Sequence, residues 1–411
     1  MRDRVGDPAD PTLSVGERIK FYRQRRGMSR AVLGGLIGKS ARWVKAVETG
    51  QLQQPKLPVL VKLAEALKVR DLAQFIGGQP LPMTLFQGPG HPALPAVRDA
   101  INAVGVTPDG PPPALDHLES RLGAAWRARH SAPDHRTVLG GLLPDLIRDA
   151  KYAMRAYEGA ERRRALALLA GAYNLVQFFL AYQPAADLLW RVAERAVMAA
   201  EESDDPKAFG DAVWLLAEAH RDAGDFDAAE SVTREGLDLL RPRLDDADDN
   251  LLGIWGALHF AAAYTAARSG QKGAAWGWWD RAGWVAGRLP EIHYDPMTSF
   301  SRTIMDAHAV TVAVELKQGA ESIRQAERTA ATAIPSQPRR ARHLIEVARA
   351  YQIGNAGPAA LSALTDAYTT APETIRYNGY ARRMIREYAQ GSTPALQRDA
   401  RDLADKVGLL V

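Results

Sequence analysis

Apolar residues recur at helical spacing along most of this chain. From Leu115 to the C-terminus, alanine and leucine repeat at positions i, i+3, i+4 and i+7, which places them on one face of an α-helix. This part of the sequence has no run of alternating β-branched residues, which a half-buried strand would show. About five further helices fit before Ile76. The pattern therefore predicts an all-α protein.

Proline and glycine break the helical pattern once, early in the chain. GGQPLPM, QGPGHPALP and TPDGPPP follow one another closely, and prolines and glycines at that density oppose regular structure. Between them, ALPAVRDAINAV at residues 93–104 predicts one short helix that packs on either of the neighbouring domains. We therefore expect a flexible arm at residues 1–13, a compact domain at 14–76, a linker at 77–113 and a larger domain at 114–411.

The segment GMSRAVLGGLIGKSARWVKAVETG predicts two short helices around a glycine. Ser29 is a good N-cap for the first helix, and Gly38 permits the tight turn that ends it. Ser40 caps the second helix, in which Val44 and Val47 face inward. The free face of this second helix carries Ala41, Arg42 and Lys45. Two short helices around a glycine turn, with cations on the exposed face of the second, is the plan of a helix-turn-helix DNA reader.

The residues of this segment also resemble a known family. The series of glycine, serine and apolar positions from Gly27 to Gly50 is similar to that of the Cro/CI-type (xenobiotic-response-element) repressors, and the match extends over residues 14–76. The resemblance implies a DNA-binding domain of about five helices. Such proteins often have glutamine where this chain has Arg30. Arginine can also hold a phosphate, so the difference concerns sequence preference.

The distribution of charge agrees with this interpretation. The whole chain has a formal net charge of +4, yet residues 1–75 contain 15 lysines and arginines against 7 acidic residues. The basic excess therefore lies entirely in the helix-turn-helix segment. Such an excess is the electrostatic footprint of phosphate contacts.

The position of each residue on the predicted helices indicates which part of the DNA it is expected to contact. Arg42 and Ala41 begin the exposed face of the recognition helix and are expected to face base edges, with Lys45 and Ala46 as second-rank positions. Trp43 lies on the flank of this helix and is expected to pack partly on the domain and partly on the DNA backbone. Phosphate contacts are expected from the cations Arg30, Lys39 and Lys56 and from the helix N-termini at Ser29 and Ser40.

The larger domain contains imperfect repeats. The run LAEAHRDAGDFDAA is similar to a tetratricopeptide (TPR) helix pair, in which small residues let two helices approach and glycine turns the chain. Further units begin near His259 and Val347, and degenerate units lie between them and before Asp204. From Ala229 to Ala275 the spacing is 46 residues, longer than the TPR period of about 34. Stacked pairs of this kind form a superhelix whose concave face commonly holds a peptide.

A helix-turn-helix segment followed by degenerate TPR-like repeats resembles the RRNPP group, whose members are controlled by peptides, and many regulators of high-GC actinobacteria. The resemblance implies a larger domain that senses an effector and dimerises. Two half-sites of double-stranded operator DNA, about 10–10.5 bp apart or a multiple of that, require a two-fold symmetric homodimer. The polar residues expected on the concave face are the ligand candidates: Asn174, His220, Asn250, Arg302, His308, Arg342 and Asn378.

Three kinds of partner remain open for the larger domain. A deep polar groove favours a signalling peptide, and a closed apolar pocket favours a small molecule. A flat exposed patch favours a protein partner, with the repeats acting as a scaffold.

Several other function classes are not expected. The chain has no cysteine, so structural disulfides and thiolate metal sites are excluded. It has no H-E-x-x-H, P-loop, G-x-S-x-G or Rossmann pattern, so we expect neither an enzyme nor a bound cofactor or metal. No apolar run approaches the ~18 residues of a membrane span, and the N-terminus lacks the apolar core of a signal peptide. We therefore expect a cytoplasmic protein.

Overall fold

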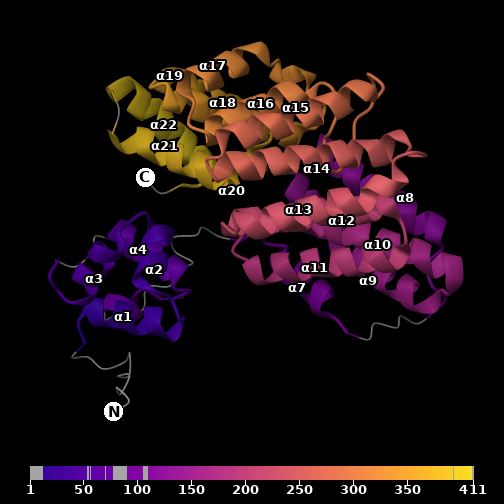
Figure 1. Cartoon of the computed structure of the whole chain (residues 1–411), viewed down its shortest axis with the longest axis horizontal. Coiled ribbons are helices and arrows are strands. Elements are labelled where there is room, and N and C mark those ends of the chain that lie inside the picture. Colours follow the sequence, from indigo (N-terminus) through magenta and orange to yellow (C-terminus); the bar gives the residue numbers. More distant parts are fainter. Residues whose placement is uncertain are drawn as a thin grey trace. The chain divides into compact units, whose positions relative to one another are not determined.

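The computed structural model describes residues 13–52, 55, 57–69, 71–76, 90–104, 110–391 and 393–409. Throughout these residues the regular structure is helical and contains no β-strand, so the predicted all-α fold class is confirmed. The chain divides into two compact units, Met1–Gly90 and His91–Val411, which are labelled along the chain in Figure 1. None of the described helices is long and apolar enough to cross a membrane.

The first unit is built from short helices whose starting points are set by serine caps. Ser14 and Glu17 form a reciprocal capping box at the first helix, and Ser29 Oγ accepts a hydrogen bond from Val32 N at the second. The helices are α1 (Val15–Arg25), α2 (Arg30–Ile37), α3 (Ala41–Glu48), α4 (Leu57–Ala66) and α5 (Ala73–Ile76).

The turn between α2 and α3 depends on Gly38. This residue has φ 69° in the left-handed region, which glycine adopts without a steric cost. Ser40 Oγ then accepts a hydrogen bond from Trp43 N and starts α3. The core beneath the two helices contains the buried side chains Ile19, Leu33, Val44, Leu63 and Phe75.

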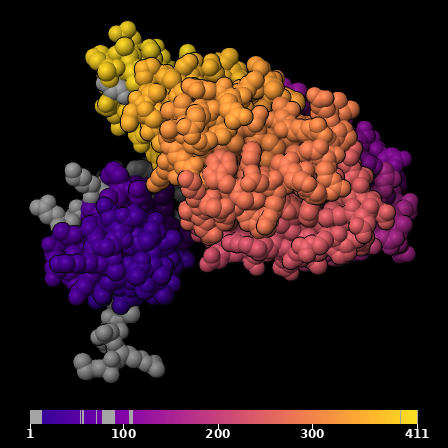
Figure 2. All heavy atoms as spheres, turned by 45° about the horizontal axis from the view of Figure 1, so that its top comes forward, coloured from indigo at the N-terminus to yellow at the C-terminus, as the bar shows by residue number. Residues whose placement is uncertain are grey.

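The second unit consists mainly of antiparallel helix pairs stacked in chain order, and its colours run in bands from magenta to yellow in Figure 2. Its helices are α7 (Leu94–Asn102), α8 (Leu115–Ser131), α9 (His135–Ala156), α10 (Gly159–Leu180), α11 (Ala186–Ser203), α12 (Pro206–Ala223), α13 (Phe226–Leu240), α14 (Asp249–Arg268), α15 (Lys272–Arg288), α16 (Ile304–Glu315), α17 (Gly319–Arg328), α18 (Gln337–Ile353), α19 (Gly357–Thr370), α20 (Pro372–Tyr377), α21 (Gly379–Gly391) and α22 (Pro394–Val407).

The repeats read from the sequence correspond to helix pairs in this unit. The TPR-like run forms α12 and α13, which turn at Gly224 with φ 83°. The units near His259 and Val347 form α14–α15 and α18–α19, and the degenerate unit between them forms α16–α17. The local pattern of small and apolar residues was therefore sufficient to locate these pairs.

The short helix within the expected linker is α7, and it packs on α9 as part of the second unit. Val97, Ala100 and Ile101 belong to the same buried core as α9 and α10. Lys151 of α9 donates hydrogen bonds to the carbonyl oxygens of Ala100, Ile101 and Ala103 at distances of 2.8 to 3.1 Å. A cation at the C-terminal end of a helix is favourable there because the unpaired carbonyls carry partial negative charge.

Helices from the early and late parts of the second unit touch, since α8 and α9 contact α18 and α20. Glu373 of α20 accepts hydrogen bonds from Arg136 N at 2.5 Å and from Thr137 Oγ1 at 2.6 Å, both in the first turn of α9. On the neighbouring α8, His130 lies 2.8 Å from Ser336 Oγ just before α18. We call the Glu373 bonds the closing contact. They join segments more than 230 residues apart and turn an open stack into a closed arrangement.

Candidate functional site

The exposed face of α3 has the composition expected of a recognition helix. Ala41, Arg42 and Lys45 are exposed, while Val44 and Val47 are buried in the core. The structure therefore leaves the predicted base-facing side chains open to a partner. Their contact with bases stays a prediction.

Trp43 and Ala46 are half-buried beside this face. The Trp43 ring packs against the core of the unit, and Lys39 Nζ lies 5.7 Å from the ring centre. The predicted phosphate cation Lys56 lies outside the described residues. Ser29 and Ser40 use their oxygens to cap α2 and α3, so their hydroxyl protons remain available for an acceptor such as a phosphate.

Glu48 at the end of α3 forms ion pairs with two arginines. Its carboxylate is 2.5 Å from Arg23 Nε and 2.7 Å from Arg30 Nε, and Glu48 itself is 3% exposed. Arg23 also donates to the Met28 carbonyl oxygen at 2.8 Å. The pairing fixes α1, the start of α2 and the end of α3 together. Arg30 uses only its Nε for Glu48, so its terminal NH2 groups can still donate to a phosphate.

Residues 14–74 match the family described as "Helix-turn-helix domain". The first unit is a helix-turn-helix DNA-binding domain. The match covers the segment in which the residue pattern indicated this domain, and it confirms that interpretation. No curated protein has a matching sequence.

Three solved structures are similar to the helix-turn-helix protein at low level. Bacillus thuringiensis PlcR in complex with the peptide PapR7 and DNA is 13% identical, with a TM-score of 0.29 over 67% of this chain and 94% of that one. Apo ComR from Streptococcus vestibularis is 15% identical, with a TM-score of 0.27 over 74% and 99%. ComR from S. thermophilus with DNA and its signalling peptide ComS is 16% identical, with a TM-score of 0.23 over 67% and 93%. Structural similarities with TM-scores this low give no information about the ligand of this chain.

A cavity lies inside the second unit, between the helices that the closing contact brings together. Residues of α8, α9, α10, α12, α14, α16, α18 and α20 line it, and the space open to the centres of water-sized molecules is about 170 Å³. One water needs only ~10–15 Å³ on such a measure. Tyr182 is 46% exposed, yet burial raises its pKa to about 12, so much of its exposed surface faces this cavity.

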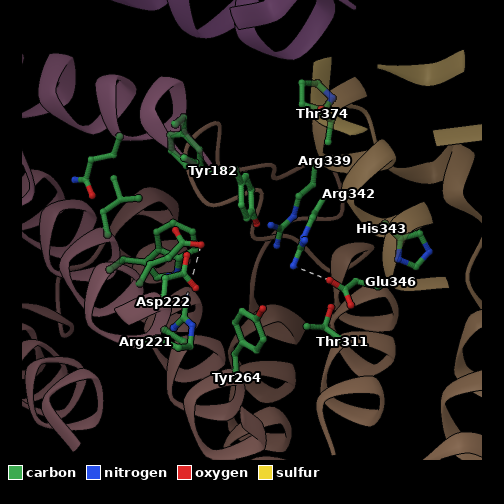
Figure 3. A pocket seen from close by; sticks show the side chains of 18 of the residues that line it. Tyr182, Arg221, Asp222, Tyr264, Thr311, Arg339, Arg342, His343, Glu346 and Thr374 are labelled. Carbon is green, nitrogen blue, oxygen red and sulfur yellow. Dashed lines mark ion pairs between the residues drawn. The ribbon is translucent and has the colours of Figure 1, made fainter. Parts of the chain in front are cut away.

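Charged side chains are concentrated on the cavity wall (Figure 3). Arg342 is 2.6 Å from Glu346, which is also 2.7 Å from Arg349 behind the wall. Burial alone would raise the pKa of Glu346, but Arg342 and Arg349 outweigh it and lower that pKa. Glu218 on the α12 side has a raised pKa because burial disfavours its carboxylate. The cavity is therefore polar and strongly structured by charge.

Two of the seven predicted ligand residues line this cavity. Arg342 projects into it, and His308 stacks on Phe260 with ring centres 3.4 Å apart. His220 lies outside the lining, where its ring packs on Trp190 at 4.8 Å.

The other four predicted ligand residues lie away from the cavity and mostly have structural partners. Asn378 Oδ1 accepts a hydrogen bond from Ala381 N and caps α21. Arg302 donates to the Leu289 and Gly287 carbonyl oxygens. Asn250 is exposed at the start of α14, where its Nδ2 donates to Asp248, and Asn174 is buried within α10. The structure does not bring the predicted set together.

Sequence reasoning missed most of the lining. Arg339 and His343 stand in the RRARH run, which showed a cluster of cations but not its direction. Arg129, Arg136 and Tyr182 had no local signal, since the two arginines stand among the other polar residues of WRARHSAPDHRT and Tyr182 follows the end of α10. Only the packing of distant helices identifies them.

Acidification is expected to destabilise the second unit through His343. This side chain is 4% exposed, neither ring nitrogen has a hydrogen-bond partner among the residues that the structure describes, and burial lowers its pKa to about 4. The unfolded chain protonates it near pH 6.5. Stability is therefore lost as pH falls from 6.5 towards 4, by at most about 3 kcal/mol for this group.

Urea unfolding of the wild type and of His343→Leu at pH 7 and pH 4.5 measures this effect. The variant should lose less stability between the two pH values. His117→Gln is the matched control because His117 is exposed on α8. Equal pH dependence in the wild type and His343→Leu would contradict the prediction.

Proposed function

We propose that the protein is a homodimeric transcription regulator that binds double-stranded operator DNA through α3 and is controlled by an effector held in the cavity. The observation that carries the proposal is a helix-turn-helix domain joined to a unit whose cavity contains buried polar atoms without partners. Such atoms cost free energy when they are left unpaired. A ligand that pairs them stabilises one conformation over others, and this difference can shift a conformational equilibrium.

The effector class is a peptide or a small molecule. The closing contact supports a compact ligand, either a short peptide or a small molecule, because a long extended peptide needs an open groove. A TPR scaffold that acts through a protein partner would have no use for the charged cavity. Two protomers would each place one α3 in a half-site.

On the DNA, we assign base reading to the exposed end of α3 and phosphate contacts to its surroundings. Arginine at the start of a recognition helix pairs best with guanine O6 and N7. The base-facing set is Ala41, Arg42, Lys45 and Ala46, and the backbone-facing set is Ser29, Arg30, Lys39, Ser40, Trp43 and Lys56.

Arg42→Ala is expected to weaken operator binding by ~1–3 kcal/mol and to relax preference at one base position in each half-site. The exposed Arg42 contributes nothing to the buried core, so folding should be unaffected. Binding to a randomised operator library, read by sequencing, measures the preference. Lys39→Ala is the comparison variant: it should leave the profile unchanged and reduce the salt slope of binding by about 0.9. An unaltered profile for Arg42→Ala would remove this residue from base reading.

The function as a whole is tested in two stages. Genomic fragments retained by the full-length protein are sequenced to find an operator, and affinity for that operator is then measured with and without a metabolite and peptide extract of the same cells. An enriched operator whose affinity changes at least tenfold with the extract supports the proposal. No enriched DNA would reject DNA-directed regulation, and enriched DNA with an unchanging affinity would favour the scaffold alternative.

A further inference from the structure

Three arginines around the cavity have no carboxylate within ion-pair distance in the described part of the chain. They are Arg129 of α8, Arg136 of α9 and Arg339 of α18, and we call them the arginine cluster. Their situation differs from that of Arg342 on the same wall, which has Glu346 at 2.6 Å. Buried charges in proteins are ordinarily paired. An unpaired group of three therefore requires a physical explanation.

Arg129 and Arg136 are held in place without an ion pair within the described residues, and the more distant carboxylates of Glu218 and Glu373 offset their charges only in part. The guanidinium carbon of Arg129 lies 4.0 Å from the ring centre of Phe178, and its Nε is buried without a hydrogen-bond partner. Arg136 Nη1 donates to the carbonyl oxygens of Phe178 and Phe179 at 3.0 and 2.5 Å, while its Nε is buried and unpaired. Both side chains are preorganised and retain unused N–H donors.

Arg339 supplies a further donor to the cavity. Figure 3 shows its side chain projecting into the open space beside Arg342. Within the described residues its guanidinium has no hydrogen bond or ion pair, although its backbone N–H donates to Ser336 Oγ and so fixes the first turn of α18. It is the member of the cluster best placed to meet a ligand.

Titratable groups near the cluster report the same excess of positive charge. Burial, with Arg136 and Arg339 adding to it, lowers the pKa of Arg129 to about 9. Burial, with Arg136 and Arg129 adding to it, lowers the pKa of His135 to about 2. Burial and Arg339 also lower the pKa of His308. The histidines are therefore neutral at pH 7, and an anion in this position would be strongly stabilised.

The rest of the wall limits what kind of anion can bind. Phe178 stacks near Trp214, with ring centres 6.5 Å apart, and Phe260 lies on the same lining. Glu218 and Asp222 line the same cavity and disfavour a ligand with several negative charges. A ligand with a single carboxylate on an apolar body fits both the aromatic wall and the two acidic side chains. A phosphate dianion does not, because it carries two negative charges.

We propose that the cavity binds an aromatic or apolar carboxylate, with Arg129 and Arg339 holding its carboxylate and the aromatic wall around Phe178 and Trp214 holding its body. The inference rests on the proposed function, because it names the ligand class of the proposed effector site. Guanidinium groups suit this task because their forked donors match the two oxygens of a carboxylate. A free organic acid and the C-terminal carboxylate of a short peptide share this chemistry.

Calorimetry on the full-length protein tests the proposal with four probes. Indole-3-acetate and indole-3-acetamide represent the free acid and its neutral counterpart, and acetyl-glycyl-phenylalanine and its C-terminal amide represent the peptide. At least one acid should bind at least tenfold more tightly than its amide, and the better pair identifies the source. Equal binding of acids and amides, no binding up to 10 mM, or tighter binding of inorganic phosphate would overturn the proposal.

Variants locate the site. Arg129→Gln and Arg339→Gln should each abolish the preference for acid over amide, and Arg339→Lys should restore part of it. Arg340→Gln is the matched control, because Arg340 is the next residue, binds the Ile334 carbonyl oxygen and does not line the cavity. A preference that survives both Gln variants would overturn the assignment.

A second measurement does not need a ligand. Since a half-buried cation without an ion-pair partner is costly, Arg339→Gln should raise the Tm of the ligand-free protein by about 2 °C or more. A lowered Tm would show that the arginine stabilises the fold instead. The outcomes distinguish a failure of this proposal from a failure of the proposed function. If the acid binds but operator affinity does not change, the binding site is supported and effector control is rejected. If an extract effector acts equally on wild type and Arg339→Gln, effector control stands and this site does not.

Discussion

Glu48→Ala should unfold most of the helix-turn-helix domain and abolish operator binding. The substitution leaves Arg23, which is itself buried, and Arg30 without their shared carboxylate. Removing one partner of a buried ion pair costs ~3–5 kcal/mol, because an uncompensated charge stays in the interior. Small domains have total stabilities of roughly 5–15 kcal/mol, so a loss of this size removes much or all of the margin.

Hydrogen exchange of the backbone amides in α1, α2 and α3, measured on the full-length protein over a denaturant series, gives the effect. Glu65→Ala is the matched control, since Glu65 is an exposed carboxylate in the same domain, and it should change stability by no more than about 0.5 kcal/mol. If Glu48→Ala retained wild-type stability, the ion pair would be too weakly formed to fix α1 against α3.

Glu373→Ala should destabilise the second unit by ~2–4 kcal/mol. It removes the acceptor for Arg136 N, Thr137 N and Thr137 Oγ1, and of these donors at the first turn of α9 Arg136 N is left buried. The helix-turn-helix domain should keep its own stability, because it forms a separate compact unit.

Hydrogen exchange measured across the chain distinguishes this loss from general unfolding. Protection should fall first at the start of α9 and in α20. Glu202→Ala serves as control because its exposed pair with Arg162 is worth only ~0–1 kcal/mol. Uniform loss of protection throughout the second unit would contradict a local role for the closing contact.

Features encoded by neighbouring residues were predictable from the sequence. The two helices around Gly38 and the pair turned at Gly224 were both located, because caps, glycine turns and helical spacing act within a few residues. The expectation for α7 was less complete: proline-rich segments on both sides suggested a linker, whereas Val97 and Ile101 pack on α9. That packing is a tertiary effect with no local signal.

The cavity could not be predicted for the same reason. Arg129 and Arg339 are 210 positions apart and meet only through the closure of the helix stack. Asn378 shows the opposite error, since its amide suggested peptide recognition but its oxygen caps α21. An asparagine immediately before a helix is a local signal for an N-cap, and that simpler explanation was the correct one.

The closing contact also dictates an order of events during synthesis. An open stack of repeats can fold from its N-terminal end as each pair leaves the ribosome, because each repeat touches only its neighbours. Here the first turn of α9 must wait for Glu373, more than 230 residues later, before its buried donors are satisfied. The nascent chain therefore acquires its completed cavity only after α20 has been synthesised, and loss of α20 would leave the first turn of α9 without these bonds.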